Sequence, residues 1–273
     1  MENKELMDIA RKVRIDIIEM LSESKSGHPG GSLSCADILT VLYFDKMYVD
    51  IYEQKNDDRD RLVLSKGHAA PALYAVLAER GFFDKKELKT LRKYGSILQG
   101  HPDMNSTPGI DMTTGSLGQG LSAANGIAIA GKLNKKEYTV YAILGDGELE
   151  EGQVWEAVMT AAHYKLDNLI VFIDNNGLQI DGTNKEVMNI YPIDEKFKAF
   201  NWNVIKIDGH DIEQIKNAID QGKKIKGKPT VIIAKTIKGK GVSFMENQVQ
   251  WHGVAPNKEQ EEEALKELMG GAQ

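Results

Sequence analysis

The sequence predicts an α/β fold: a doubly wound, mostly parallel sheet with helices on both faces. Two observations carry this prediction. Short apolar runs rich in β-branched residues alternate with stretches of helical periodicity, and polar triplets follow two of those runs directly. The clearest unit joins the runs 138–144 and 169–174 through a helical stretch at 152–165. A crossover of this length links parallel strands, so these two runs are expected to lie side by side in the sheet.

The N-terminal region is expected to consist of two helices separated by a loop. Apolar residues recur at helical spacing from Lys4 to Ser24, and the glycine-rich segment 26–31 stops that helix. Ser34 is placed to cap the second helix, which runs to about Phe44 and has an acidic residue, Asp37, in its first turn.

The remaining elements follow from the same signs: β-branched apolar runs for strands and helical spacing for helices. In chain order they are a strand at 61–65, a helix at 69–80 closed by Gly81, a strand at 204–207, a helix at 212–221, a strand at 230–234 and an acidic helix at 258–269. The sequence contains no internal repeat and no linker. We therefore expect a single domain over residues 1–273.

Composition excludes several classes of protein. The 273 residues suffice for a large core, and 34 Lys and Arg against 40 Asp and Glu give a net charge of -6. That balance argues against an extended nucleic-acid or anionic-membrane footprint, and no apolar run approaches the roughly 18 residues of a membrane span. With Cys35 as its one cysteine, the chain can form neither an internal disulfide nor a thiolate zinc site. We expect a cytoplasmic protein that binds small molecules or proteins, with no nucleic acid and no membrane as partner.

Two polar triplets carry the clearest chemical signal. Gly145-Asp146-Gly147 and Asp174-Asn175-Asn176 follow neighbouring strands, at the sheet edge where α/β proteins bind ligands. Glycines beside Asp146 let backbone N–H groups approach a phosphate, while Asp146 and Asn176 offer the oxygen ligands that Mg²⁺ or Ca²⁺ prefers. Either triplet alone is better explained as a tight turn. Together, at this spacing, they favour a site for a metal-bound diphosphate.

A Rossmann dinucleotide site fits the sequence less well. The segment 115–120 reads Gly-Ser-Leu-Gly-Gln-Gly, but no strand precedes it.

The two triplets and their surroundings resemble the thiamine diphosphate (ThDP) fingerprint, and those of transketolases in particular. The match includes the flanking text 145–152 and 174–182 and runs along nearly the whole chain. Its further motifs, in the order of the family, are Ser26-Gly27-His28-Pro29-Gly30, Leu64-Ser65-Lys66-Gly67-His68, Gly100-His101-Pro102-Asp103, the segment 113–120 and Trp251-His252-Gly253.

Five of the six histidines adjoin a glycine, a pattern typical of loops that display an imidazole to a ligand. Four of these lie in the family motifs: His28, His68, His101 and His252. His210 is equally well explained as part of a turn that caps the next helix, and His163 as structural.

The resemblance implies that ThDP binds together with a divalent metal ion, Mg²⁺ by default and Ca²⁺ or Mn²⁺ as alternatives. The implied contacts are Asp146, Asn176 and the carbonyl of Leu178 for the metal, Gly147 and His68 for the diphosphate, and Gly115, Ser116 and Leu117 for the two rings.

The resemblance also implies residues for the substrate. His28, His101 and His252 would orient donor hydroxyls and shuttle protons, with His252 also near the cofactor. The segment 252–256 departs by one residue from the usual His-Gly-Ala-Pro, which weakens the match at His252. Glu151 matches a glutamate of a carboxylate network between two active sites, but a solvated helix start would explain it too.

Transketolases are more than twice as long, and every motif above belongs to their N-terminal, diphosphate-binding domain. The resemblance therefore implies the N-terminal subunit of a split transketolase (EC 2.2.1.1-like), completed by a chain that carries the pyrimidine-binding and C-terminal domains, in an α2β2 assembly. The implied reaction moves a two-carbon ketol unit from a ketose, by default a pentose-phosphate-pathway sugar phosphate, to an aldose.

Two alternatives stay open at this point. One is the α-subunit of another ThDP enzyme, such as a 2-oxo acid dehydrogenase. The other is a non-catalytic regulatory or binding subunit that keeps the fold.

Overall fold

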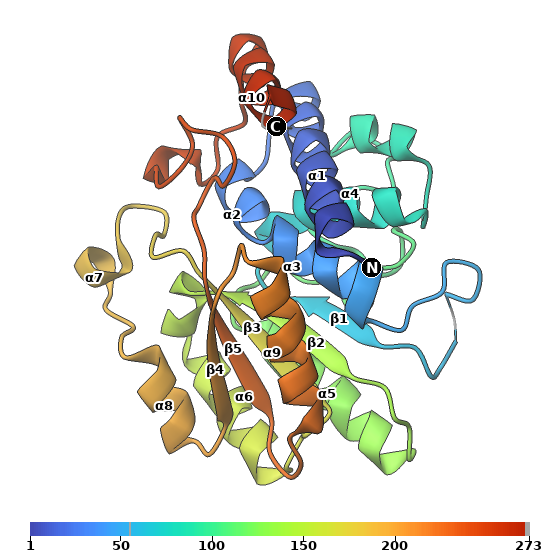
Figure 1. Ribbon diagram of the computed structural model, residues 1–273, viewed down its shortest axis with the longest axis vertical. Helices are drawn as coiled ribbons and strands as arrows, with labels where there is room; N and C mark the ends of the chain where they lie inside the picture. Colours follow the sequence, from blue (N-terminus) through green and yellow to red (C-terminus); the bar gives the residue numbers. More distant parts are fainter. Residues whose placement is uncertain (55, 271–273) are drawn as a thin grey trace.

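The computed structural model describes residues 1–54 and 56–270 and confirms the α/β prediction (Figure 1). Five strands form one parallel sheet in the order β1-β2-β3-β5-β4. The strands are β1 (Arg61–Leu64), β2 (Val140–Gly145), β3 (Leu169–Asn175), β4 (Asn203–Asp208) and β5 (Thr230–Lys235). Each predicted run is a strand, with bounds within two residues of those expected.

Helices pack against both faces of the sheet, so the doubly wound prediction is also confirmed (Figure 1). One core lies between the sheet and α1 (Asn3–Ser24), α3 (Ala36–Val41), α4 (Ala70–Arg80) and α9 (Ile212–Lys224), with α10 (Lys258–Gly270) behind α1. The second core lies under α5 (Gln119–Leu133), α6 (Gly152–His163) and α8 (Ile193–Ala199). In β2, Tyr141 and Ile143 face the first core while Val140, Ala142 and Leu144 face the second. Burial on both sides explains why the strands read as continuous apolar runs.

Near the N-terminus the structure differs from the prediction in two places. Helix α2 (Pro29–Ser34) occupies the second half of the segment 26–31 expected as a loop, because a proline is well suited to the first helical turn. Its glycines allow close packing: a Cβ at Gly30 would lie 2.9 Å from Lys238 Cγ. The prediction that Ser34 caps the second helix is wrong, since its hydroxyl donates to Gly31 O and to the Asp174 carboxylate instead.

Besides α2, three further helices were not expected from the sequence: α5, α7 (Asn184–Val187) and α8. Helix α5 contains three glycines and begins after Gly118, whose φ of 83° is in the left-handed region. Glycine in a helix interior weakens the local helical signal, so packing against α6 and the sheet determines this element. Between α4 and α5 the chain makes a long connection, 81–118, whose regular structure is a 3-10 helix at Lys85–Thr90.

A buried ion pair joins the segments that converge at the carboxyl edge of the sheet. Lys66, directly after β1, donates to the Asp174 carboxylate at the end of β3 and to Gly31 O of α2 (2.6 Å). Thr236, directly after β5, donates to the same carboxylate. Both charged side chains are almost completely buried. Burial opposes both charges, but the pairing outweighs it, so the pKa of Lys66 is raised and that of Asp174 lowered.

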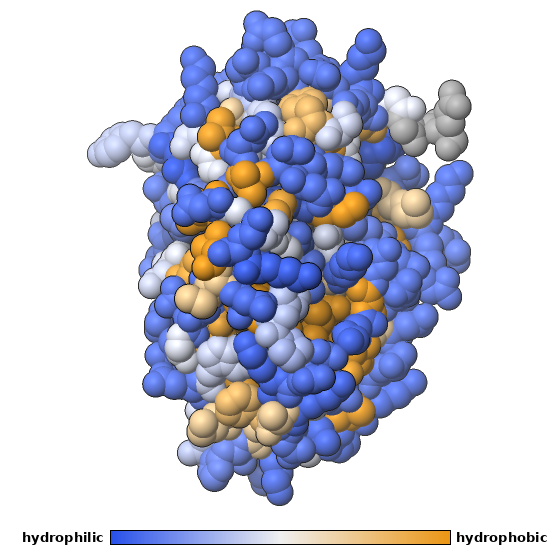
Figure 2. All heavy atoms as spheres, turned by 90° about the vertical axis from the view of Figure 1, so that its left-hand side faces the viewer, coloured by the Kyte–Doolittle hydropathy of each residue, from blue (hydrophilic) through white to orange (hydrophobic). Residues whose placement is uncertain are grey.

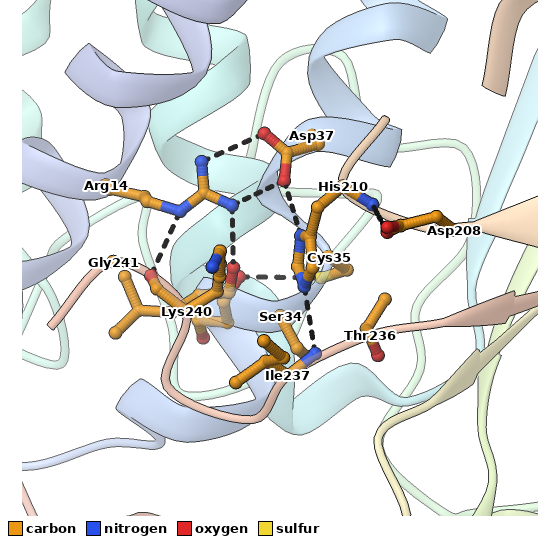
Figure 3. Close-up of polar contacts among 12 residues, drawn as sticks. Arg14, Ser34, Cys35, Asp37, Asp208, His210, Thr236, Ile237, Lys240 and Gly241 are labelled. Atoms are coloured by element: carbon orange, nitrogen blue, oxygen red, sulfur yellow. Dashed lines mark hydrogen bonds and ion pairs between the residues drawn. The ribbon is translucent and has the colours of Figure 1, made fainter. Parts of the chain in front are cut away.

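A second buried network ties α1 to α3 and to the turn before α9 (Figure 3). Arg14 donates two hydrogen bonds to Asp37, at 2.9 and 2.6 Å, and His210 Nδ1 lies 2.7 Å from the same carboxylate. The Ile237 N–H donates to His210 Nε2 (2.9 Å), so the imidazole proton is on Nδ1 and points to Asp37. His210 is therefore a structural residue, and Asp211 rather than His210 caps α9.

In the part of the chain that the structure describes, no helix combines the length and hydropathy of a bilayer-crossing segment. Polar residues cover most of the face in Figure 2, and apolar side chains emerge in small patches between them.

We expect Lys66→Met to lower the free energy of unfolding by about 3–5 kcal/mol, because it leaves Asp174 as a buried charge without its partner. The matched control is Lys132→Met, which breaks an exposed pair with Asp167 (2.6 Å) and should cost about 0–1 kcal/mol. Urea denaturation of both variants measures the difference. Equal losses would show that the buried pair has no special weight.

Asp37 provides a pH-dependent prediction. Burial alone would raise its pKa, but Arg14 and His210 outweigh burial and hold the pKa at about 2. A carboxylate with a folded-state pKa below its unfolded value stabilises the fold above the unfolded pKa, and this contribution is lost as pH falls toward the folded pKa. The stability gap between wild type and Asp37→Asn should therefore shrink by about 2 kcal/mol as pH falls from near 4 to near 2. Denaturation series across this pH range test it; a constant gap contradicts it.

Candidate functional site

A cavity of about 380 Å³ lies at the carboxyl edge of the sheet, where the segments after β1, β2, β3 and β5 meet. Most of the predicted site residues line it: His28, His68, Gly115, Leu117, Asp146, Gly147, Glu151, Asn176, Leu178 and His252. These residues come from distant parts of the chain. The topology therefore brings together what the sequence motifs could only predict separately.

Asp146 is held between two backbone donors. Gly147 N donates to its Oδ1 (2.9 Å) and Gly177 N to its Oδ2 (2.6 Å). The side chain is buried, and burial raises its pKa to about 7 despite these hydrogen bonds. A carboxylate in this state is suited to a bound cation, which would favour its ionised form.

The other predicted metal ligands lie close by. Asn176 Oδ1 accepts a hydrogen bond from Leu178 N (3.1 Å), and both residues line the same cavity as Asp146. Within the described residues no cluster of three or more His, Cys, Asp or Glu could hold a metal ion. A metal here would thus depend on one carboxylate, one amide and one carbonyl, with the remaining positions open to phosphate oxygens and water.

Three imidazoles form a triangle on the other side of the cavity. The ring centroids of His28, His68 and His252 lie 5.3–5.5 Å apart. Burial is the main reason that the pKa of His28 and of His252 falls to about 4 and that of His68 well below its usual value, with nearby cations adding to it. The rings are neutral at pH 7 and can each accept and donate a hydrogen bond. Among residues 1–54 and 56–270, the buried His28 Nδ1 has no hydrogen-bond partner, which fits a ligand in the cavity.

His101 and Ser116 lie at the rim rather than in the wall of this cavity. The exposed His101 ring packs on Gly115, where a Cβ would lie 3.3 Å from the ring. Ser116 lines a shallow neighbouring hollow together with Gly115 and Gln119. These two residues are therefore accessible from outside, unlike the histidine triangle.

Two lysines of the cavity wall were not predicted from the sequence. Lys238 Nζ lies 3.0 Å from His252 Nδ1, and burial lowers its pKa to about 8. Lys66, in the buried pair with Asp174, contributes to the same wall. Lys238 stands next to a glycine, just as the selected histidines do, so this signal was present in the sequence. Lys66 also adjoins a glycine, Gly67, but this signal does not indicate its burial or its pairing with Asp174.

Glu148 is a third residue that was not predicted, and it holds the loop after β2 in place. Its Oε1 accepts from Gly118 N (2.9 Å) and Ser65 Oγ, and its Oε2 from Gly145 N (3.0 Å). The side chain is buried, so it joins the loop after β2 to the start of α5 and the end of β1. Because Glu148 is one of three glutamates in four residues, nothing in its local sequence distinguishes it.

Glu151 lies at the start of α6 and is exposed. A Cβ at Gly118 would lie 2.8 Å from Glu151 Cβ, so a glycine is required where α5 begins beside it.

The comparisons with known proteins agree with this geometry. The family model described as "Transketolase, thiamine diphosphate binding domain" matches residues 3–272. A relative from Clostridium sp. (strain MSTE9), the "6-deoxy-6-sulfo-D-fructose transketolase subunit SqwG", is 46% identical over 97% of this chain and 96% of its own. A relative from Phocaeicola vulgatus, named as one of the subunits of an apulose-4-phosphate transketolase, is 44% identical over 95% of this chain and 92% of its own.

Among solved structures, a transketolase from Campylobacter jejuni superposes with a TM-score of 0.93 at 34% identity. The match covers 98% of this chain but 43% of that one, so the chain spans less than half the length of this relative. The resemblance inferred from the motifs is confirmed: the chain belongs to the transketolase family and corresponds to its thiamine diphosphate binding domain.

Proposed function

We propose that this chain is the diphosphate-binding subunit of a ThDP- and Mg²⁺-dependent transketolase. It would transfer a two-carbon ketol unit from a ketose phosphate, or a similar anionic ketose, to an aldose. One observation carries this proposal: a single cavity contains both the oxygen ligands around Asp146 and a triangle of neutral imidazoles. A metal–diphosphate group suits the first part and a polyhydroxylated substrate the second.

In this proposal Asp146, Asn176 and the Leu178 carbonyl hold the metal ion, while Gly147 and His68 contact the diphosphate. Gly115, Ser116 and Leu117 support the cofactor rings. When bound, ThDP supplies a nucleophilic carbon and an electron sink for cleavage of the ketose C2–C3 bond.

The residues of this chain orient the substrate and move protons. His28 and His252 are neutral at pH 7, so His28 can accept a proton from a donor hydroxyl and return it, while His252 can donate a hydrogen bond to a substrate oxygen. His101 at the rim reaches the same space from the outside. Lys238 Nζ, 3.0 Å from His252 Nδ1, donates to that nitrogen when charged, so the imidazole proton lies on Nε2 and is available to a substrate oxygen.

We also propose that the active enzyme includes a second chain with the pyrimidine-binding and C-terminal domains. Two relatives that match this chain over nearly their whole length are named as transketolase subunits, which supports a separate partner. An α2β2 assembly would set Glu151 of the two copies in a carboxylate network between the sites. One of these relatives is named for a sulfonated ketose and the other for a ketose phosphate, so an anionic sugar is the substrate class we favour, with the pentose-phosphate pathway and the cytoplasm as the default setting.

The proposal is tested by isolating this chain from its host in ThDP and Mg²⁺, recording native mass spectra and assaying ketol transfer on the same sample. We expect a complex with a second chain, active in ketol transfer from a ketose phosphate and inactive in the decarboxylation of 2-oxo acids. Decarboxylation without ketol transfer would instead identify a 2-oxo acid dehydrogenase-like protein. A chain that purifies with itself alone, binds ThDP and shows no turnover would identify a regulatory role.

Asp146 tests the metal site separately. In the assembled complex, Asp146→Ala should abolish Mg²⁺-dependent ThDP binding, measured by isothermal titration calorimetry with and without Mg²⁺, because the proposed metal set has a single carboxylate. Asp181→Ala is the matched control, an exposed aspartate on the neighbouring loop whose loss should leave cofactor affinity within about twofold. Unchanged affinity in Asp146→Ala would remove this residue from the metal site.

A further inference from the structure

Arg92 lies beside Gly100 and His101, next to the wall of the cavity, and has no role in the function proposed above. It belongs to the connection 81–118 and has a φ of 61°, in the left-handed region that non-glycine residues rarely adopt. Its N–H donates to Leu98 O (2.8 Å), and the adjacent Leu91 is buried, as is Leu98. The backbone of Arg92 is therefore fixed although its side chain is exposed.

The guanidinium group of Arg92 lies directly on Gly100. A Cβ at Gly100 would be 3.0 Å from Cζ of Arg92 and 3.2–3.3 Å from two of its nitrogens. The backbone on both sides of Gly100 is fixed by the buried Tyr74, whose hydroxyl lies at hydrogen-bond distance, 2.9 Å, from the carbonyl oxygens of Gln99 and His101. A glycine at this position thus leaves the space that the guanidinium occupies beside His101.

This position faces the histidines of the proposed substrate site. Burial is the first cause that lowers the pKa of His28 and of His101, and the positive charge of Arg92 is the next in both. The other titratable groups around His28 are Lys238 and the imidazoles of His68, His101 and His252. The guanidinium lies against Gly100, next to His101, whose ring packs on Gly115 of the cavity wall, so its charge acts on both imidazoles from beside this wall.

In residues 1–54 and 56–270, Arg92 takes part in no ion pair, whereas neighbouring cations of the same segment do. Lys93 pairs with Glu23 (2.8 Å) and Lys85 with Asp16 (2.8 Å). A guanidinium presents a planar fork of donors that matches the oxygens of a phosphate or sulfonate. Its charge is thus available to an anionic group that enters the cavity.

We propose that Arg92 is a specificity-determining residue that binds the tetrahedral anionic group, phosphate or sulfonate, of the sugar substrate. Gly100 and Tyr74 set its position, and His101 lies beside the bound group. This inference rests on the proposed ketol transfer and adds a residue that selects anionic sugars over neutral ones.

The first test concerns the position of Arg92 and needs no turnover. In NMR titrations of the chain, the imidazole pKa of His101 should rise in Arg92→Gln, because a facing positive charge is removed. Lys89→Gln, an exposed cation of the same segment, should leave it unchanged. An unchanged His101 pKa in Arg92→Gln would place the guanidinium away from the histidines and overturn the proposal.

The second test uses the complex isolated with its partner chain. We compare a ketose phosphate, the sulfonate analogue of the same sugar and the same ketose without an anionic group. Arg92→Gln should lower kcat/KM for an anionic donor roughly ten- to a hundredfold more than for the neutral donor, mainly through KM. Arg92→Lys should restore part of the loss, and Lys89→Gln should match wild type. The anionic donor with the larger loss identifies the group that Arg92 binds.

The outcomes separate the two proposals. A wild-type complex that transfers no ketol unit from any donor contradicts the proposed function. An active wild type in which Arg92→Gln loses activity equally on neutral and anionic donors overturns the specificity role and indicates a contact with the partner chain. An active Arg92→Gln complex with unchanged kinetics overturns it as well.

Discussion

The buried ion pair between Lys66 and Asp174 is the constraint on which the site depends. Asp174 belongs to β3, and Lys66 follows β1. Asp174 accepts hydrogen bonds from Ser34 of α2 and from Thr236 after β5, and Lys66 donates to the carbonyl oxygen of Gly31 in α2. Each of these segments continues directly into site residues: α2 follows His28, Lys66 precedes His68, and Asp174 precedes Asn176. A buried charge pair has few alternative arrangements that satisfy both groups. It therefore fixes the relative positions of chain segments that are far apart in sequence.

The cavity above this pair has two electrostatic halves. On one side Asp146 is buried, and burial raises the pKa of its carboxyl to about 7. On the other side Lys238 and three imidazoles are crowded together, and the pKa of each is lowered. A ligand that combines a cation with an anionic diphosphate relieves both conditions at once. Such a ligand explains why one small cavity contains both a buried carboxylate and a cluster of basic side chains.

Much of this arrangement could be predicted from the sequence. Strands buried on both faces give unbroken apolar runs, and the spacing of the triplets at 145–147 and 174–176 indicated their common edge of the sheet. Local propensity was a poorer guide to α5, whose glycines and alanines are explained by tight packing against α6 and β2. Ser34 was predicted as a helix cap because serine is common at the N-cap position. In the folded chain its hydroxyl instead donates to Asp174, a residue far away in the sequence. Lys66 and Glu148 could not be selected because their importance depends on burial, which no local pattern encodes.

The division between a buried centre and an exposed rim suggests how substrates can differ between related enzymes. The residues proposed for the metal and diphosphate lie on strand ends and are joined to the core by buried hydrogen bonds, as Glu148 illustrates. Arg92, His101 and Ser116 are exposed and belong to the long connection 81–118. Substitutions there disturb little of the core, because surface positions away from buried networks usually change stability by about 0.5 kcal/mol or less. The rim can therefore change with the sugar while the buried centre, and with it the chemistry of the cofactor, stays the same.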